Sequence, residues 1–349
     1  MEKSFVIKIP RCLNPDNALK FADRVNRNTP RAESYCYDFS NLQHCPPFGL
    51  LVVLNSIRYN MSRFPSVEHY MYPSLNLEGK FSIDIPSAVR YACHLGLFQH
   101  CGWDEGRKTE LGDSTINCIP ITKITNYVLD EYKSEGPRLL DRIEAFSRLL
   151  ALRLTRDQND DLTKLLNYSF REIIRNTFEH SGSSEIWVCG QFWPQKHRAE
   201  IALMDQGCGI MRSLSKNTKY KLENDMTANL LALEPGVSQS FGDKEQNNYY
   251  QNSGFGLYVA KSFGKKWGAF VLASGNHAVF INPRYSEGKN IVTNIQGTCV
   301  YISLDTNMIK NILVSIERII KEGEGIAQGE EGRIKTASKS SSSFFLKNE

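Results

Sequence analysis

The sequence predicts an α/β (α+β) protein with two domains, and two observations support this fold class. In the first third of the chain, short apolar strands alternate with segments of helical periodicity. In the second half, amphipathic helices stand between strands that end in glycine-bearing turns. The 349 residues, of which 41% are hydrophobic, are enough for two cores. We expect an α/β interaction domain over residues 1–136, a second domain over residues 137–306, and a helix with a polar tail over residues 307–349.

Composition narrows the classes of partner. The formal net charge of +4 is small for this length and the basic residues are scattered, so there is no footprint for nucleic acid or an anionic membrane. Nine cysteines without a C-x-x-C pair predict free thiols in a reducing compartment. The chain has no apolar run near the roughly 20 residues of a spanning helix, and its first residues lack the apolar core of a signal peptide. We therefore expect a cytoplasmic protein.

The N-terminal half alternates strands and helices. Asp16 and Pro86 stand where helices begin, and Gly96 stands where the second of these helices ends. A further apolar helix starts near Phe48, directly after a strand and a proline-containing turn. The predicted strands cover residues 5–9, 35–39, 81–85 and 116–121.

The segment YDFSNLQHCPPFGLLVVLNSI, residues 37–57, resembles the strand-loop-helix core of STAS domains, the fold of anti-sigma-factor antagonists. The resemblance extends over residues 5–100 and implies a protein-interaction domain without chemistry of its own. Regulatory members carry a phosphorylatable serine in the turn that Cys45, Pro46 and Pro47 occupy here, so we expect no phosphoswitch. The implied partner of this domain is another protein or a second copy of the chain.

The C-terminal half is organised around residues 167–181, NYSFREIIRNTFEHS, in which Glu172, Asn176 and His180 recur every four residues. At about 100° per residue, these side chains share one face of a helix. A carboxylate, a carboxamide and an imidazole on one face need polar partners when they are desolvated, which favours a binding site over core packing. An amphipathic helix over residues 139–154 precedes this stretch.

Two glycine-bearing turns follow this helix. Strands predicted over residues 185–191 and 199–204 form a hairpin, and the second strand delivers Asp205 at its end, where ligands approach an α/β sheet. After the irregular residues 212–253, with a helical piece at 224–233, a glycine-rich turn begins a helix whose N-terminus offers free N–H groups to an anion. The first turn contains Gly207, Gly209 and Ile210, and the second contains Gly254, Phe255, Gly256 and Leu257.

The order of these elements resembles the GHKL ATPase superfamily, which includes histidine kinases, gyrase B, MutL-type repair proteins, heat-shock chaperones and anti-sigma serine kinases. The shared order is a helix with Glu and Asn, two strands, D-x-G-x-G, a lid, G-x-G-L, and strands over residues 269–273, 279–282 and 299–304. The resemblance implies a two-layer α/β sandwich with a mixed sheet, helices on one face, and ATP held beneath a lid formed by residues 212–253. The chain contains no P-loop sequence.

The resemblance assigns roles to single residues. Asn176 binds Mg²⁺ through its carboxamide oxygen, and Glu172 orients or deprotonates the water that attacks ATP. The alternative for Glu172 is a protein that binds ATP without appreciable hydrolysis. Asp205 resembles the carboxylate that accepts a hydrogen bond from the adenine amino group, and Thr298 resembles the late threonine near the adenine. His180 has two interpretations, a polar residue at the base of the pocket or a cap for the last helix carbonyls.

The glycine-bearing turns are expected to let the backbone approach the ligand. Two lysines, Lys244 and Lys261, are candidates for phosphate contacts, with a solvated lysine as the alternative for each. The residues expected at the base are Gly207, Gly209 and Ile210, and those expected at the phosphates are Gly254, Phe255, Gly256 and Leu257.

The function expected from these features is an ATPase that binds Mg²⁺ and ATP and acts as a nucleotide-dependent switch in a protein complex. An anti-sigma-like protein serine/threonine kinase is one alternative, and an ATP-binding adaptor that does not hydrolyse is another. Residues 139–166 contain no histidine, which argues against a histidine autokinase.

Overall fold

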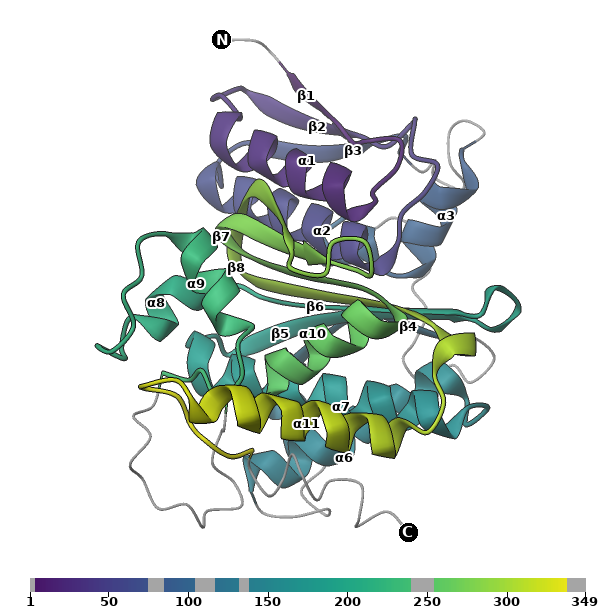
Figure 1. Ribbon diagram of the computed structural model, residues 1–349. Helices are drawn as coiled ribbons and strands as arrows, with labels where there is room; N and C mark the ends of the chain where they lie inside the picture. Colours follow the sequence, from purple (N-terminus) through teal and green to yellow (C-terminus); the bar gives the residue numbers. More distant parts are fainter. Residues whose placement is uncertain (1–3, 75–84, 104–116, 132–137, 240–253, 338–349) are drawn as a thin grey trace.

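The computed structural model describes residues 4–74, 85–103, 117–131, 138–239 and 254–337. Within these ranges, the strands form a parallel three-stranded sheet and an antiparallel five-stranded sheet. Figure 1 shows the two sheets as separate layers, with helices between them and a second helical layer on the far side of the larger sheet. The predicted α/β (α+β) class is confirmed.

The smaller sheet and its helices form the N-terminal module, residues 4–103 as far as they are described. β1 (Phe5–Lys8), β2 (Ser34–Asp38) and β3 (Glu68–Tyr72) lie in this order and run parallel. α1 (Pro15–Asn28) and α2 (Pro47–Arg63) connect them. Parallel neighbours need such helical crossovers, because a tight turn reverses the chain direction.

Two elements of this module differ from the sequence prediction. β3 was not predicted, because its residues EHYMY are mostly polar or exposed. The strand predicted over residues 81–85 lies outside the described residues except for Ile85, which is not in a strand. The helix predicted after Pro86 is confirmed as α3 (Ser87–His94), and α4 (Leu97–His100) follows it.

The five-stranded sheet has the strand order β4-β5-β6-β8-β7. β4 precedes residue 136, where we expected a domain boundary, yet it pairs with β5 and belongs to this sheet; residue 136 itself is outside the described residues. The strands are β4 (Cys118–Thr125), β5 (Glu185–Trp193), β6 (Arg198–Asp205), β7 (Gly268–Ile281) and β8 (Lys289–Asp305).

Every described pairing in this sheet is antiparallel, which corrects the mixed sheet that the resemblance implied. β6 and β7 run in the same direction, as a helical crossover requires, but β8 lies between them. β8 returns from β7 and pairs antiparallel with both neighbours, so the two parallel strands never touch. The strands predicted over residues 269–273 and 279–282 are one continuous strand, β7, whose register is irregular around Gly275.

Long helices form the layer on the far side of the larger sheet in Figure 1. α7 starts after Asn159, whose side chain accepts a hydrogen bond from the N–H of Leu162, and it continues into a π-helical turn, Thr177–Ser181. The helices of this layer are α6 (Leu139–Thr155), α7 (Asp160–Asn176), α10 (Gly256–Trp267) and α11 (Ile312–Gln328).

Shorter helices complete the C-terminal part of the chain. α5 (Asn126–Asp130) follows β4, and α8 (Gly209–Leu214) begins four residues after the end of β6. α9 (Asp225–Ala232) confirms the helical piece predicted near residues 224–233. Short 3₁₀ turns lie at Pro194–Lys196 and Thr306–Met308.

Helices cover both faces of the five-stranded sheet, which corrects the expectation of helices on one face. Alternate side chains of a strand point to opposite sides: Val188 joins the core beneath the long helices, whereas Trp187 joins the core shared with the N-terminal module. The rings of Phe48 on α2 and Tyr301 on β8 lie 5.3 Å apart, and the guanidinium of Arg58 lies 5.1 Å from the ring of Trp187. α1 and α2 therefore lie between the two sheets.

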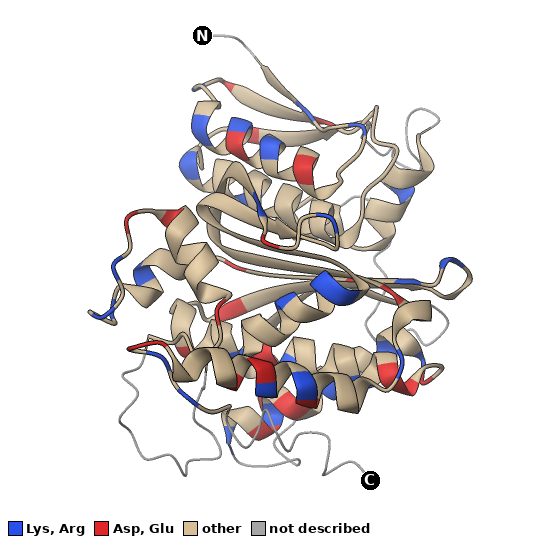
Figure 2. Ribbon diagram, in the orientation of Figure 1, with Lys and Arg blue, Asp and Glu red and all other residues tan. Residues whose placement is uncertain are grey.

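Basic and acidic residues are interspersed along the ribbon in Figure 2. Along α1, Lys20 pairs with Asp16 and Arg27 pairs with Asp23, each at 2.5 Å and one turn apart. Such exposed pairs contribute little to stability but leave no stripe of one sign on this helix. No helix in the described ranges has the length and apolar character needed to cross a membrane.

Candidate functional site

A cavity lies on the face of the five-stranded sheet that α7 and α10 cover. It is bounded by the end of α7, the start of α10, and α8. It encloses about 810 Å³ when the open space at its mouth is included. The sequence-predicted residues in its wall come from four separate stretches of the chain: Asn176, His180, Asp205, Gly209, Ile210, Gly254, Gly256, Leu257 and Thr298.

Asp205, the last residue of β6, supplies the buried acid of this cavity. It is 4% exposed, and its Oδ1 accepts a hydrogen bond from the N–H of Gly207 at 2.7 Å, while the hydroxyl of Thr177 lies 3.5 Å from Oδ2. Burial raises the pKa of Asp205 to about 6, and hydrogen bonds from Gly207, Thr177 and the Thr298 backbone oppose this shift. At pH 7 the side chain is therefore mainly an ionised hydrogen-bond acceptor.

Thr298 faces Asp205 because the β6–β8 ladder pairs the two residues. The preceding Gly297 has φ +83°, and a Cβ there would overlap the carbonyl oxygen of Asp205. Ser274 on β7 ties this corner together, since its hydroxyl donates to the Gly297 carbonyl at 2.8 Å and accepts from the N–H of Ile210 at 3.0 Å. One serine thus links β7, β8 and the start of α8.

His180 lies in the cavity wall. Its position was predicted from a four-residue spacing on a regular α-helix, but residues 177–181 form a π-helical turn, whose hydrogen bonds run from i to i+5. Burial lowers the pKa of His180 to about 4, so the ring is neutral at pH 7. Its Nδ1 lies 2.7 Å from Nε2 of Gln239, which therefore donates to the ring, and the hydroxyl of Ser213 donates to Oε1 of Gln239 at 3.2 Å. This chain of hydrogen bonds joins the end of α7 to α8.

Glu172 lies outside the described wall of the cavity. It is 2% exposed, and its Oε1 accepts from Nη2 of Arg171 at 2.5 Å. A Cβ added at Gly256 would lie 2.5 Å from Oε2 of Glu172, so the carboxylate is positioned directly beneath the first residue of α10. The predicted water-activating group is thus buried under the glycine turn, one layer behind the cavity.

Three other predicted residues are also placed behind the wall as far as the structure describes it. Gly207 contacts Ser181 at the end of the π-helical turn, and Phe255 is fully buried. Lys261 is not in the described wall, and its ammonium pairs with Glu234 at 3.7 Å. Lys244 and the last third of the predicted lid, residues 240–253, lie outside the described residues.

Sequence reasoning missed part of the site. Two of the missed residues had a local signal: Thr177 follows Asn176 directly, and Ser274 stands between the end of the predicted strand 269–273 and Gly275. No local signal marks Ser213 or Gln239. The apolar part of the wall was also missed, because its members read as ordinary core residues. It consists of Ile173, Ile186, Leu203, Leu214, Val237 and Val300, among others.

Comparisons with protein-family models, with curated proteins and with solved structures find no match to this chain. The functional assignment therefore depends on the geometry and chemistry of the cavity itself.

Proposed function

We propose that this chain binds ATP with Mg²⁺ in the cavity and acts as a nucleotide-dependent switch in a protein complex. The observation that carries the proposal is one cavity whose wall contains Asp205 and its ladder partner Thr298 as well as Asn176 and Gly256. We assign the first two residues to the base end of the cavity and the last two to the phosphate end. An ionised acceptor between apolar walls suits a flat base that carries an amino group, and a glycine-bearing helix start suits an anion.

The end formed by Asp205 fits adenine. Its carboxylate retains acceptor positions beyond the hydrogen bonds from Gly207 and Thr177, because an ionised carboxylate has about four lone-pair sites. The adenine amino group donates a hydrogen bond to such an acceptor, whereas guanine presents a carbonyl oxygen there. Apolar neighbours such as Val300 and Leu203 offer surfaces for the ring faces. The proposal therefore includes selectivity for adenine over guanine.

The opposite end fits phosphates and a metal. α10 begins at Gly256 with its N-terminus at the cavity, where backbone N–H groups and the helix dipole favour negative charge. Asn176 would supply an oxygen ligand to Mg²⁺, which offsets phosphate charge when bound. The described residues contain no cluster of three or more His, Cys, Asp or Glu side chains that could hold a metal. One carboxamide plus phosphates and water is a set that Mg²⁺ accepts.

Whether the bound ATP is hydrolysed depends on Glu172, the expected water-activating group. The ion pair between Arg171 and Glu172, beneath Gly256, favours a second candidate function, an adaptor that binds ATP without appreciable turnover. Transfer to a serine or threonine of a partner, as in an anti-sigma-like kinase, remains the further alternative.

Equilibrium binding of a fluorescent ATP analogue to the full chain, with and without Mg²⁺, tests the proposal. We expect saturable binding that Mg²⁺ strengthens, and loss of the Mg²⁺ effect in Asn176→Ala. Asn282→Ala, in the turn between β7 and β8, serves as the control because its side chain contacts only local backbone in the described hydrogen bonds. Absence of saturable binding in the wild type would refute the proposed function. Phosphate release and label transfer from ATP, measured in parallel, separate the ATPase, adaptor and kinase alternatives.

A further inference from the structure

The strand β8 carries a bulge directly behind the base end of the cavity. Ser274 on β7 pairs with Thr298, but the next residue, Gly275, pairs with Ile295. Gln296 and Gly297 are therefore extra residues on β8, and the strand bends away from its partner at this point. We call residues 293–297 the β8 bulge.

The cavity side of the β8 bulge supports the base-recognition residues. Gly297 lies against the backbone of Asp205, and its carbonyl accepts the hydrogen bond from Ser274. Thr298, the next residue, lines the cavity. A shift of the bulge backbone would therefore move both Thr298 and the main chain of Asp205.

The other side of the β8 bulge is held by the N-terminal module. Nδ2 of Asn26 donates to the Asn294 carbonyl at 2.6 Å, and Nδ2 of Asn55 donates to the Gln296 carbonyl at 3.2 Å. Nη2 of Arg27 donates to the Thr293 carbonyl at 3.0 Å and to Oδ1 of Asn276 at 2.7 Å. These side chains come from α1 and α2 and bind backbone carbonyls more than 200 residues further along the chain.

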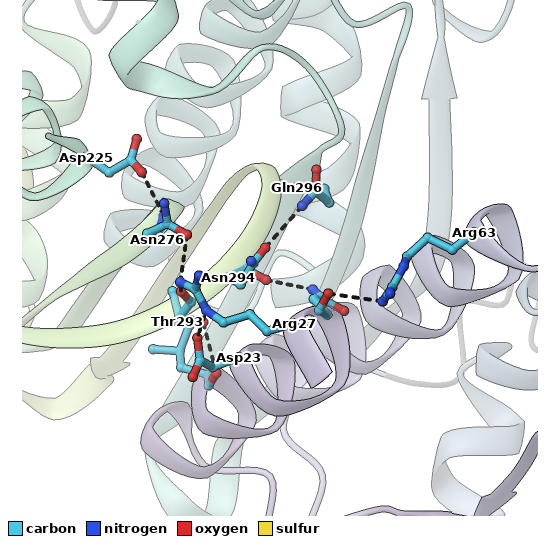
Figure 3. A network of polar contacts seen from close by, with 10 residues as sticks. Asp23, Arg27, Arg63, Asp225, Asn276, Thr293, Asn294 and Gln296 are labelled. Atoms are coloured by element: carbon cyan, nitrogen blue, oxygen red, sulfur yellow. Dashed lines mark hydrogen bonds and ion pairs between the residues drawn. The ribbon is translucent and has the colours of Figure 1, made fainter. Parts of the chain in front are cut away.

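Figure 3 shows how this network spans the two parts of the chain. Arg27 extends from α1 between Asp23 and the pair formed by Asn276 and Thr293. On the other side of the bulge, Nε2 of Gln296 donates to Oδ1 of Asn294 at 3.1 Å. The N–H of Asn276 in turn donates to Asp225 of α9 at 2.9 Å. The bulge is thus fixed from α1, from α2 and, through β7, from α9.

The two asparagine side chains that hold the bulge are buried. Asn55 is fully buried and Asn26 is 5% exposed, so water is largely excluded from both amides. The accepting residues Asn294 and Gln296 are half-buried, and a carbonyl there that loses its amide donor loses the partner that fixes its position. The amides therefore act as fixed supports for the bulge.

We propose that Asn26, Arg27 and Asn55 are positioning residues for base recognition, and that the N-terminal module sets the base selectivity of the cavity through the β8 bulge. This inference rests on the proposed function, because it takes a nucleotide as the ligand. None of the three residues touches the cavity wall; they act through the backbone that carries Thr298 and Asp205. In this proposal the N-terminal module is a structural part of the nucleotide site. The faces of α1 and α2 that would do this are packed against the larger sheet.

Asn55→Ala and Asn60→Ala form a matched pair for the test. Both asparagines lie on α2, both are fully buried, and each donates through Nδ2, Asn55 to Gln296 of the bulge and Asn60 to the hydroxyl of Tyr37 inside the module. The ratio of dissociation constants for fluorescent GTP and ATP analogues with Mg²⁺ is measured on the full chain. We expect Asn55→Ala to reduce this ratio by about tenfold, the effect of one misplaced buried polar contact, and Asn60→Ala to keep the wild-type ratio.

A second pair keeps the test decisive if Asn55→Ala does not fold, which thermal unfolding would show. The side chain of Arg27 is 38% exposed and tolerates substitution, and Arg24 on the same helix bonds the Lys8 carbonyl inside the module. We expect Arg27→Gln to lower the ratio and Arg24→Gln to leave it unchanged. A wild-type ratio in the folded Asn55 or Arg27 variant overturns the positioning role, as does a wild type that binds ATP and GTP equally. A wild type that binds neither nucleotide refutes the proposed function itself.

Discussion

The carboxylate of Glu172 lies directly beneath Gly256, so that a Cβ on Gly256 would come within 2.5 Å of Oε2 and 2.9 Å of the Glu172 Cβ. α7 and α10 approach each other closely here because the first residue of α10 has no side chain. The same contact fixes where the N-terminus of α10 meets the cavity. This close contact allows a test of the end of the cavity that we propose binds the phosphates.

Gly256→Ala should push α10 away from α7 and misplace its N-terminus. We expect ATP affinity to fall at least about tenfold and the free energy of unfolding to fall by about 1–3 kcal/mol, the usual cost of overpacking. Gly325→Ala on α11 is the matched control, since its Cβ would meet no atom within 4 Å and alanine favours a helix. Calorimetric ATP titration and urea unfolding measure both effects. Wild-type affinity in Gly256→Ala would contradict the assigned phosphate end.

Glu172→Gln tests the catalytic role suggested by the sequence. The ion pair with Arg171 is buried, so we expect the free energy of unfolding to fall by about 3 kcal/mol when one charge of the pair is removed. ATP affinity should stay within about threefold, because the carboxylate lies behind the cavity wall, and any phosphate release should disappear. Steady-state phosphate release gives the answer. Wild-type turnover in the variant would rule out Glu172 as the water-activating group.

Asp205→Asn should separate stability from binding. The pKa of Asp205 is raised from 3.8 to about 6 by burial, so the folded state holds this proton more tightly than the unfolded state. The contribution of the group to the free energy of unfolding therefore falls as pH rises from about 4 to about 6. The stability of the variant relative to the wild type should rise by roughly 3 kcal/mol over this window. Urea unfolding at several pH values between 4 and 7 measures it.

The same variant should bind ATP at least about tenfold more weakly, because a carboxamide offers a weaker acceptor to the adenine amino group. Asp305→Asn, at the exposed last residue of β8, is the control for both measurements. A variant with unchanged ATP affinity would count against Asp205 as the base-reading residue.

His180 should titrate in the opposite sense. Burial lowers its pKa from 6.5 to about 4, so the unfolded state binds this proton more tightly. The contribution of the ring is fully present above about pH 6.5 and is lost as pH falls toward 4. His180→Asn should therefore lose less stability than the wild type between pH 7 and pH 4. His197→Asn, in an exposed turn, should follow the wild type; identical pH profiles for all three proteins would contradict the buried neutral ring.

Much of the local structure could be predicted from the sequence. The 3.6-residue periodicity and the polar stripe predicted α7. The apolar run that ends in Asp205 predicted a strand end, and the glycine-rich turn at Gly254 and Gly256 predicted a helix start, both at the right residues. Local signals also placed Asn176, Asp205 and Gly256 as candidate ligand contacts, and the structure brings them into the wall of one cavity. His180 also lies in this wall, but on a π-helical turn and not on the regular α-helix from which its position was predicted.

The sequence by itself determined most of the helices and strands, with β3 as an exception, and which polar and glycine residues stand at their ends, because these properties depend on neighbours within a few residues. Tertiary structure alone decided that β8 lies between β6 and β7, that Glu172 pairs with Arg171 beneath Gly256, and that α1 and α2 cover the second face of the larger sheet. Strand order and burial depend on contacts between residues far apart in the sequence, such as Asn26 and Asn294, which are 268 positions apart, and no local pattern encodes such a contact.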